Sequence, residues 1–312
     1  MAAALALIAV LGAMTHAWGQ PAGEQEAMAQ ARRAYDLARA GRLDEAVEAL
    51  QVAVRLAPGN PLYRSALGGV YEKRGHLEQA RGALAEALRL DPGNPQFAER
   101  LEAVSLEWGA QLARERRFRA GLALARDTAA RFPQSARAHL MLGLFCARNQ
   151  QNVAAAAAYR RALDLDPESA DASVGLGIAQ SAAGMAREAA ETFEAGLKKF
   201  PQDPMHRQAY GVHLVKMAEA GSAAARARAV EMLEEALAMD PGLAEAHYQL
   251  GNLALAASDA AAAEARFALA ARNGLDDARL HWAWSRALRR LGREAEAARH
   301  IELFRARKAA EQ

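Results

Sequence analysis

The chain has 312 residues, of which 52% are hydrophobic and 24% charged, and its formal net charge is +2. This composition excludes a disordered chain, because enough apolar residues are present to form a core. The near balance of charge creates no overall field that would favour nucleic acid as a partner. The only cysteine, Cys146, excludes an internal disulfide, and its place in an apolar run predicts a buried side chain.

The chain opens with an apolar run at residues 2–14, followed by small residues around Ala17 that suit signal-peptide cleavage. The run is too short to span a bilayer but matches the central region of a secretory signal. We therefore expect a signal peptide at 1–19, a short lead-in at 20–26, and a periplasmic or secreted chain without stable membrane insertion. The alternative is an uncleaved helix that tethers the protein to a membrane, since only the terminal amine is positive before the run.

Prolines then divide the chain at a regular interval. Pro58 and Pro92 are 34 residues apart, and so are Pro133, Pro167 and Pro201 in succession. Proline cannot occupy a helix interior and disfavours helix in the residue before it, so each of these marks a corner between helices. Between corners, two amphipathic segments are separated by a short polar turn, which predicts a helical hairpin as the repeating unit.

Eight such units are predicted, and together they form a single array. Their ranges are 27–60, 61–94, 102–135, 136–169, 170–203, 204–243, 244–277 and 278–311. Residues 95–101 are expected to extend the first helix of the third unit. The extra residues of the sixth unit are expected in the turn around Glu219–Ser222.

Two columns of small residues run through the units. The first helix carries Ala34, Gly68, Gly109, Gly143, Gly177, Gly211, Gly251 and Ser285, and the second carries Ala46, Ala80, Gly121, Ala155, Ala189, Ala229, Ala263 and Ala297. Helices approach closely only where side chains are small, so these columns predict where the two helices of each hairpin touch. A third small column is broken only in the last unit, where Phe304 is expected to cover the exposed end of the array.

Unit 61–94 shows the pattern most fully, with Leu67-Gly68, Tyr71, Ala80, Leu84, Ala87 and Pro92. It resembles the tetratricopeptide repeat family, which places these residue types at the same positions of a 34-residue repeat. The resemblance covers about residues 27–311. It implies an all-α, right-handed superhelical solenoid of stacked antiparallel helix hairpins. Unit 102–135 departs most, with Trp108-Gly109 at the Leu-Gly place and Ala125 at the large one.

No catalytic or metal-binding motif is present: we find no glycine-rich phosphate loop, HExxH, nucleophile elbow or EF-hand spacing. His139, His247 and His281 share one repeat position, where the family carries an aromatic residue, so they are expected to pack rather than to bind a ligand. We therefore expect no enzyme activity, no cofactor and no metal. The arginines on the helix of Trp282, together with Arg114, Arg116, Arg117 and Arg119, are the best case for nucleic acid, but low aromatic content and export count against that partner.

The resemblance implies that the first helices line a concave groove. Late in these helices one position is basic in six of eight units: Arg39, Lys73, Arg114, Arg148, Lys216 and Arg290. This row favours an acidic or carboxylate-terminated peptide. The alternative is that cations simply complement the helix dipole in the last turn.

Aromatic residues are predicted to complete the groove. They are Tyr35, Tyr248 and above all Trp282, which shares its helix with Arg279, Arg286, Arg289 and Arg290. Arginine beside an aromatic ring is typical of binding hot spots. The predicted function is a non-enzymatic scaffold that binds a protein or peptide during assembly of a cell-envelope complex. The alternatives are a module for a polymer or small ligand such as cell-wall glycan, and an accessory subunit of an enzyme.

Overall fold

The computed structural model describes residues 22–310, and the predicted signal peptide at 1–19 lies outside this range. Every regular element in the described part of the chain is an α-helix. No helix within it is long and apolar enough to cross a membrane.

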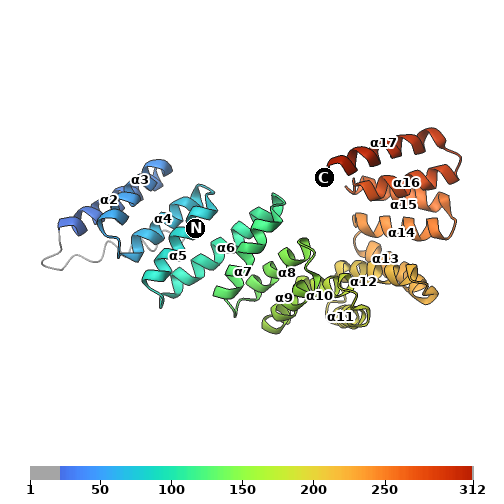
Figure 1. Cartoon of the computed structure of the whole chain (residues 1–312), viewed down its shortest axis with the longest axis horizontal. Coiled ribbons are helices and arrows are strands. Elements are labelled where there is room, and N and C mark those ends of the chain that lie inside the picture. Colours follow the sequence, from blue (N-terminus) through green and yellow to red (C-terminus); the bar gives the residue numbers. More distant parts are fainter. Residues whose placement is uncertain (1–21, 311–312) are drawn as a thin grey trace. The chain divides into compact units, whose positions relative to one another are not determined.

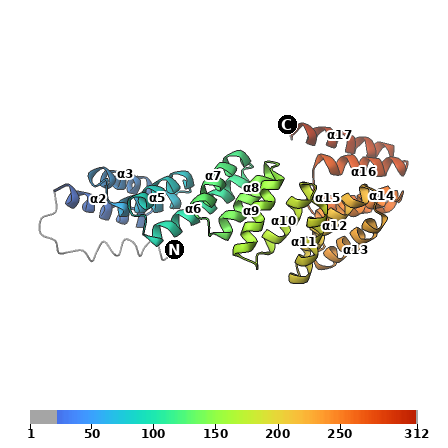
Figure 2. The same ribbon diagram turned by 60° about the horizontal axis from the view of Figure 1, so that its bottom comes forward.

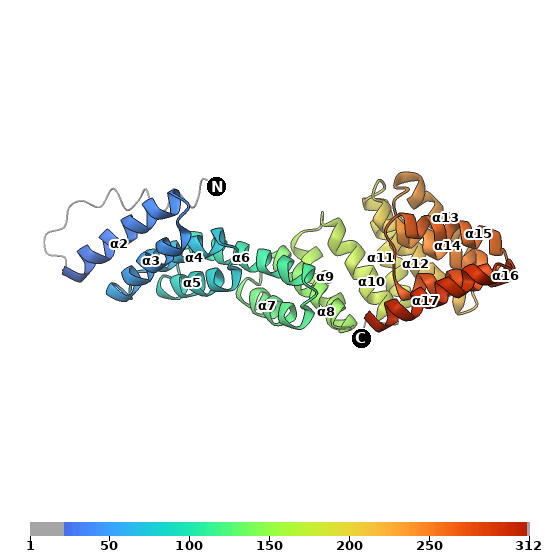
Figure 3. The ribbon, with the colours of Figure 1, turned by 90° about the horizontal axis from the view of Figure 1, so that it is seen from above.

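The chain divides into two compact units, which meet in sequence between Asn149 and Gln150. Unit 1 contains α2 (Ala22–Arg39), α3 (Leu43–Leu56), α4 (Pro61–Lys73), α5 (Leu77–Leu90), α6 (Pro95–Arg114), α7 (Phe118–Arg131) and α8 (Ala136–Arg148). Unit 2 contains α9 (Asn152–Leu165), α10 (Ala170–Ala182), α11 (Ala186–Lys199), α12 (Pro204–Glu219), α13 (Ala223–Met239), α14 (Ala244–Ala256), α15 (Ala260–Arg272), α16 (Ala278–Arg290) and α17 (Glu294–Ala310). Within each unit, consecutive helices pack side by side as hairpins (Figures 1, 2 and 3).

Six first helices, α4, α6, α8, α10, α12 and α16, begin with a side-chain cap, whereas α14, which follows Leu243, does not. The residues that accept a hydrogen bond from a backbone amide two or three residues further on are Asn60, Asn94, Ser135, Ser169, Asp203 and Asp277. Proline follows the cap in α4, α6 and α12, where its missing N–H costs nothing. By contrast the second helices α3, α5, α7, α9 and α11 begin without a side-chain cap, and only α13 and α15 among the described second helices with an assigned cap residue have one, from Ser222 and Asp259. Up to α12, the corner between hairpins is thus a firmer helix start than the turn within one.

The turn within each hairpin passes through a left-handed residue. Glycine fills this place at Gly41, Gly75, Gly184, Gly221 and Gly292. Arg116, at φ 58°, Gln150, at φ 60°, and Ser258, at φ 67°, occupy it instead in the α6–α7, α8–α9 and α14–α15 turns. A side chain in this region of backbone space costs about 1 kcal/mol or more, so the exceptions point to a local requirement for the side chain.

The predicted contacts between the two helices of a hairpin are confirmed. A Cβ added to Gly177 would lie 2.5 Å from the Phe193 ring, and one added to Gly251 would lie 2.5 Å from the Phe267 ring. Both phenylalanines are fully buried. The small residue of the first helix thus makes room for the large residue of the second, as the two columns indicate.

The α6–α7 hairpin, which departs most from the pattern, is packed differently. A Cβ on Gly121 would overlap the ring of Phe145, and one on Gly109 would overlap the side chain of Met141. Both of these large residues come from α8, the next first helix. Ala125 is too small to fill the space beside Gly109, and side chains from α8 fill it instead. The departure in sequence is therefore compensated by the following helix.

Two details of the repeat boundaries are resolved. Residues 95–101 do extend α6, which begins at Pro95. The extra residues of the sixth unit are not in the turn: α12 and α13 have 16 and 17 residues, and only residues 220–222 separate them. The turn lies where the sequence predicts it, but the prediction that it contains the extra residues was wrong, because good helix formers on both sides, such as Lys216, Met217 and the alanines after Ser222, continue each helix.

First helices also contact each other across hairpins. In unit 2, α10 contacts α12, α12 contacts α14, and α14 contacts α16, and in unit 1 α6 contacts α8. The first helices therefore form one face of each unit. At the end of unit 2, Phe304 of α17 packs on Trp282 of α16, with ring centroids 5.3 Å apart, and covers part of the terminal hairpin as the sequence predicts.

Candidate functional site

The six basic residues of the predicted row all lie exposed near the ends of first helices. Arg39 lies over the half-buried Tyr35 ring of its own helix, 5.7 Å from the centroid. Arg148 lies over Phe118, at 5.8 Å. Arg290 donates a hydrogen bond from Nη1 to the backbone carbonyl of Leu255 at 2.6 Å, in the last turn of α14. Arg290 therefore stabilises the carboxyl end of a helix, as the alternative interpretation of the row predicts. Lys73, Arg114 and Lys216 make no such hydrogen bond within the described residues.

Tyr248 and Arg279, both predicted to line the groove, are brought together from α14 and α16. The Arg279 guanidinium lies 5.1 Å from the Tyr248 ring centroid. The same guanidinium forms ion pairs with Glu245, at 3.3 Å, and with Asp277, at 2.8 Å. Arg279 is thus held by two carboxylates of its own chain, and this reduces its capacity to bind those of a partner.

Trp282 is 46% exposed, as expected for a binding residue, and one side of its ring is covered by Phe304. Arg286 and Arg289, on the same helix, are exposed. Of the four arginines predicted around Trp282, only these two are left without an intrachain contact in the described part of the chain. Within the described residues, the terminal hairpin therefore offers a partner two free arginines beside Trp282, where its sequence predicts four.

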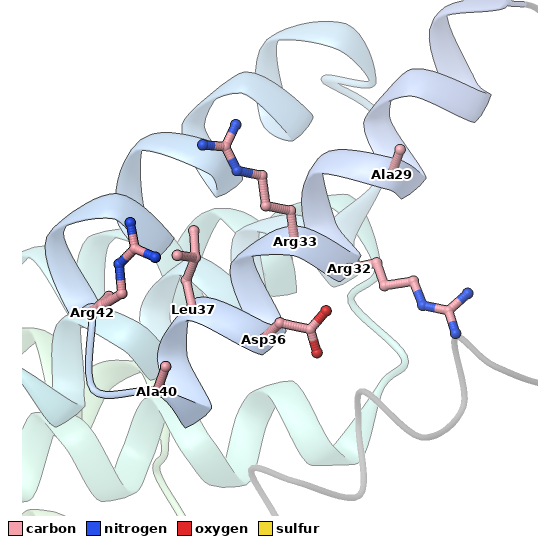
Figure 4. Close-up of a pocket in the computed structure, with 7 residues that line it drawn as sticks. All are labelled: Ala29, Arg32, Arg33, Asp36, Leu37, Ala40 and Arg42. Carbon is pink, nitrogen blue, oxygen red and sulfur yellow. The ribbon is translucent and has the colours of Figure 1, made fainter.

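One hollow lies on α2 and the turn after it, with a volume of about 560 Å³. Figure 4 shows Arg33, Leu37 and Arg42 side by side, with Asp36 and Arg32 on the neighbouring surface of the helix. Arg42 is already paired with Glu45. The hollow therefore carries mixed charge, which gives little preference for a ligand of either sign.

A second hollow, of about 460 Å³, lies at the α6–α7 turn and the end of α8. It is lined by Arg116, Arg117, Phe118, Arg119, Ala120, Arg148 and Asn149, which we call the turn cluster. Asn149 fastens its two walls together, because its side-chain nitrogen donates to the carbonyls of Phe118, at 2.9 Å, and of Phe145, at 2.7 Å. The only ion pair recorded for these arginines joins Arg117 to Glu115 at 3.2 Å. Hydrogen bonds from Gln111 and Arg117 hold the pKa of Glu115 below its usual value.

A third polar group lies between α16 and α17. His281 and His300 approach to 3.0 Å between their Nδ1 atoms, and Nε2 of His281 lies 2.9 Å from Asp276. Asp276 is also paired with Arg307. Burial, followed by the charge of His281, lowers the pKa of His300, and hydrogen bonds from Arg307 and His281 lower that of Asp276. No group of three or more metal-ligating side chains converges anywhere in residues 22–310.

The basic row and Trp282 could be proposed from the sequence, which marked the turn cluster's arginines at the α6–α7 turn only as a candidate for nucleic acid and did not indicate the pairing of His300 with His281. The repeat position alone predicted His281 as a packing residue, and it is buried. Its partner lies 19 residues away on the second helix, at a position that the repeat pattern does not single out. For the turn cluster a signal was available, because arginine replaces the turn glycine in the sequence ARERRFRA.

Solved structures with the same fold include a tetratricopeptide repeat protein from Parabacteroides merdae. It is 20% identical, with 85% of this chain and 99% of that one covered and a TM-score of 0.51. PilW, described as a widely conserved type IV pilus biogenesis factor, is 18% identical, with 66% and 93% covered and a TM-score of 0.54. The Cut9–Hcn1 hetero-tetramer of the APC/C is 14% identical, with 96% and 72% covered and a TM-score of 0.52.

A search of curated protein sequences gives no match. Two models described as tetratricopeptide repeat do match the chain, one at residues 37–103 and 147–211 and the other at residues 106–170. Together they cover more than half of its length, and the helices pair into about eight hairpins over the same region and beyond. The stacked hairpins, the small columns and these matches agree, and the chain belongs to the tetratricopeptide repeat family.

Proposed function

We propose that the protein is a non-enzymatic scaffold that binds a protein or peptide along the face formed by its first helices. The observation that carries the proposal is a set of large apolar side chains exposed on that face in unit 2. Ile178 of α10 is 47% exposed, Met205 of α12 is 43% exposed and Trp282 of α16 is 46% exposed. Apolar side chains left open to water in this way are suited to receive an amphipathic helix or an extended peptide.

The positions of these side chains support a shared role. Counted from the start of each predicted unit, Met205 is second, Trp282 fifth and Ile178 ninth, so helical periodicity places all three on one side of their helices. The helices that carry them are α10, α12 and α16, and together with α14 they form a series of first helices in which each contacts the next. A ligand that follows this face would meet apolar contacts from several hairpins.

We propose further that the partner belongs to a cell-envelope complex. The support is the apolar run at residues 2–14, which resembles a secretory signal. The fold is compatible with such a role, since PilW, a pilus biogenesis factor, is built on it. Cell fractionation with mass spectrometry of the N-terminus tests this part: a chain that retains residue 1 and stays with the cytoplasmic fraction contradicts it.

Affinity capture from native envelope extract tests the binding face. The bait is the full chain, and the face variant combines Ile178→Ser with Trp282→Ala. The chain offers a matched control on second helices: Val153 of α9, 63% exposed, and Val230 of α13, 38% exposed, both changed to Ser. A protein that is retained by the wild type and the control and lost from the face variant supports the proposal.

Crosslinking of the captured protein should then give peptides from α10, α12, α14 or α16. Loss of the partner from the control variant, with retention by the face variant, would assign binding to the second helices. Capture of no protein by any bait would contradict the scaffold function itself.

A further inference from the structure

We infer that the turn cluster is a separate binding site for an acidic segment of a protein partner, with carboxylates held by Arg116, Arg117, Arg119 and Arg148. The inference rests on the proposed protein-binding function and adds a location outside the apolar face, together with the chemistry of the ligand. Four arginines line one hollow of about 460 Å³. Guanidinium groups match carboxylates in shape and bind them through paired hydrogen bonds.

The arginines lie where helix electrostatics opposes them. Arg117 is the residue before α7, and Arg119 lies in its first turn, where no acidic residue is present. The amino end of a helix carries partial positive charge and free amides, so cations there are unfavourable and anions favourable. Helix chemistry explains Arg290 at a carboxyl end, but it does not explain these arginines.

Two other hairpins show how the chain normally treats an arginine at this point. Arg42 precedes α3 and pairs with Glu45, three residues on. Arg293 precedes α17 and pairs with Glu296, also three residues on, at 2.7 Å. The residue three after Arg117 is Ala120, which lines the hollow. The glutamate three residues on that pairs with the arginine in the other two turns is therefore absent here, which leaves Arg117 with Glu115, behind it in the turn, and an external carboxylate fits the place of the missing glutamate.

Arg116 adds a second exception in the same turn. It lies at φ 58°, at a turn position that glycine fills in five hairpins and that Gln150 and Ser258 fill in two others, so among the described residues it is the one charged residue found there. Retention of arginine at a strained position brings one more guanidinium to the hollow. Phe118 supplies an apolar wall, and Asn149 holds the wall formed by the end of α8 in place. The site is thus built before the ligand arrives.

The small extent of the cluster favours a short acidic peptide over nucleic acid. A nucleic-acid surface must follow several consecutive phosphates with basic and stacking groups. Here the basic residues gather at one turn, and the arginines of neighbouring hairpins are paired internally, as Arg74 is with Asp44 and Arg81 is with Asp127. A segment with two or three neighbouring Asp or Glu residues matches this geometry.

Fluorescence anisotropy with a short labelled Asp/Glu-rich peptide tests the site in the full chain. The same peptide with Asn and Gln in place of the acids is the uncharged probe. The triple variant Arg116→Glu, Arg117→Glu, Arg119→Glu should weaken binding of the acidic peptide by about 1,000-fold, because each of the three lost charge-assisted contacts is worth roughly tenfold. A triple variant with the same change in net charge on the second helices, Arg226→Glu, Arg299→Glu, Arg305→Glu, should stay within about threefold of wild type if the site is local, because all three arginines are exposed and lie outside the predicted groove.

A milder variant separates binding from folding. In the variant Ala120→Glu, the new carboxylate should pair with Arg117 as Glu45 does with Arg42. The variant should have a higher melting temperature and bind the acidic peptide about tenfold more weakly. Ala120→Gln fills the same volume without the charge and should bind within about twofold of wild type. Weaker binding together with higher stability cannot result from misfolding.

Several results would overturn the inference. These are equal losses from both triple variants, no effect of Ala120→Glu, binding of the uncharged peptide, and binding of a single-stranded oligonucleotide as tight as that of the acidic peptide. Affinity capture separates this inference from the scaffold function. A partner retained by both the wild type and the turn-cluster triple variant would contradict the proposed site for acidic peptides but would still support the scaffold function.

Discussion

The α6–α7 turn and the α16–α17 turn have the same backbone plan but differ in how they treat charge. Each passes through one left-handed residue, Arg116 in the first and Gly292 in the second, and each places an arginine before the second helix. In the terminal hairpin the carboxylates of Glu296 and Glu264 neutralise Arg293. In the α6–α7 hairpin the corresponding arginine has only Glu115, behind it in the turn. The number of arginines is therefore a poor guide to a site, and the absence of internal partners is a better one.

The largest expected effect concerns packing behind the α6–α7 turn. Gly121 occupies the column that holds Ala297 in the terminal hairpin, and Gly121→Ala should lower the free energy of unfolding by about 2 kcal/mol, because the new Cβ overlaps the fully buried Phe145 ring. Urea unfolding followed by circular dichroism measures this. Gly82→Ala, at an exposed helix position with open space around it, is the control and should stabilise by about 0.5 kcal/mol. Equal behaviour of the two variants would contradict the packing described here.

The next effect tests the helix-end role of Arg290. Arg290→Ala removes a hydrogen bond to the Leu255 carbonyl and a cation from the carboxyl end of α16, and should destabilise by about 1 kcal/mol. The neighbouring Arg289→Ala, at an exposed position in the same last turn, should cost less in the same unfolding assay. If Arg290→Ala leaves the free energy of unfolding unchanged and lowers the affinity for a partner instead, Arg290 acts in binding and not in stabilising the helix end.

Replacement of the left-handed arginine should act in the opposite direction. Arg116→Gly should raise the free energy of unfolding by about 1 kcal/mol, since glycine adopts this conformation without steric cost. The reverse exchange, Gly292→Arg, should lower stability by a similar amount of about 1 kcal/mol. Thermal unfolding of both variants makes the comparison direct, and two shifts of the same sign would refute it.

A carboxylate added to the α6–α7 turn should have a smaller effect. Ala120→Glu is expected to stabilise by about 0.5 kcal/mol through the helix dipole and the pair with Arg117. Glu296→Ala makes the opposite change in the terminal hairpin and should destabilise it, because Arg293 then loses its nearest partner. An increase in stability for Glu296→Ala would show that the pair contributes nothing.

The smallest difference should appear with pH, because His300 is only half-buried and water screens its charge. Since folding lowers the pKa of His300, the unfolded chain binds the proton more readily, and stability falls as the pH drops below the unfolded value near 6.5. The charged and titratable groups around it are His281, Glu296, Asp276 and Arg307. Unfolding measured across this range should show a weaker acid dependence for His300→Gln. An unchanged profile would exclude His300 as the group that titrates.

The helical repeat could be predicted closely from sequence, and the binding chemistry only in part. Proline spacing and the paired columns, such as Gly177 with Phe193, report local rules that every hairpin repeats, so periodicity reveals them. The contact of Phe145 with Gly121 could not be predicted that way, because it is a compensation between neighbouring hairpins. The same holds for Arg279, which looks free in sequence and is bound to Glu245, 34 residues away.

The basic row illustrates the same limit. Its position late in each first helix follows from the repeat, and the structure places Arg39 and Arg148 there. What each cation contacts depends on the adjoining helix, and the pattern carries no information about it. The role of the row in binding remains a prediction.

The uneven capping of the helices has a consequence for amide hydrogen exchange. The first turns of α4, α6, α8, α10 and α12 hold their amides with a side-chain oxygen, whereas those of α5, α7 and α11 do not. From α4 to α12, exchange with heavy water should therefore start at the turns inside the hairpins and leave the corners between them protected. In α7 the fast amides are those of Phe118, Arg119 and Ala120, which border the turn cluster. A ligand that binds there would slow the exchange of these three amides, so their exchange rates would report binding without any label on the protein.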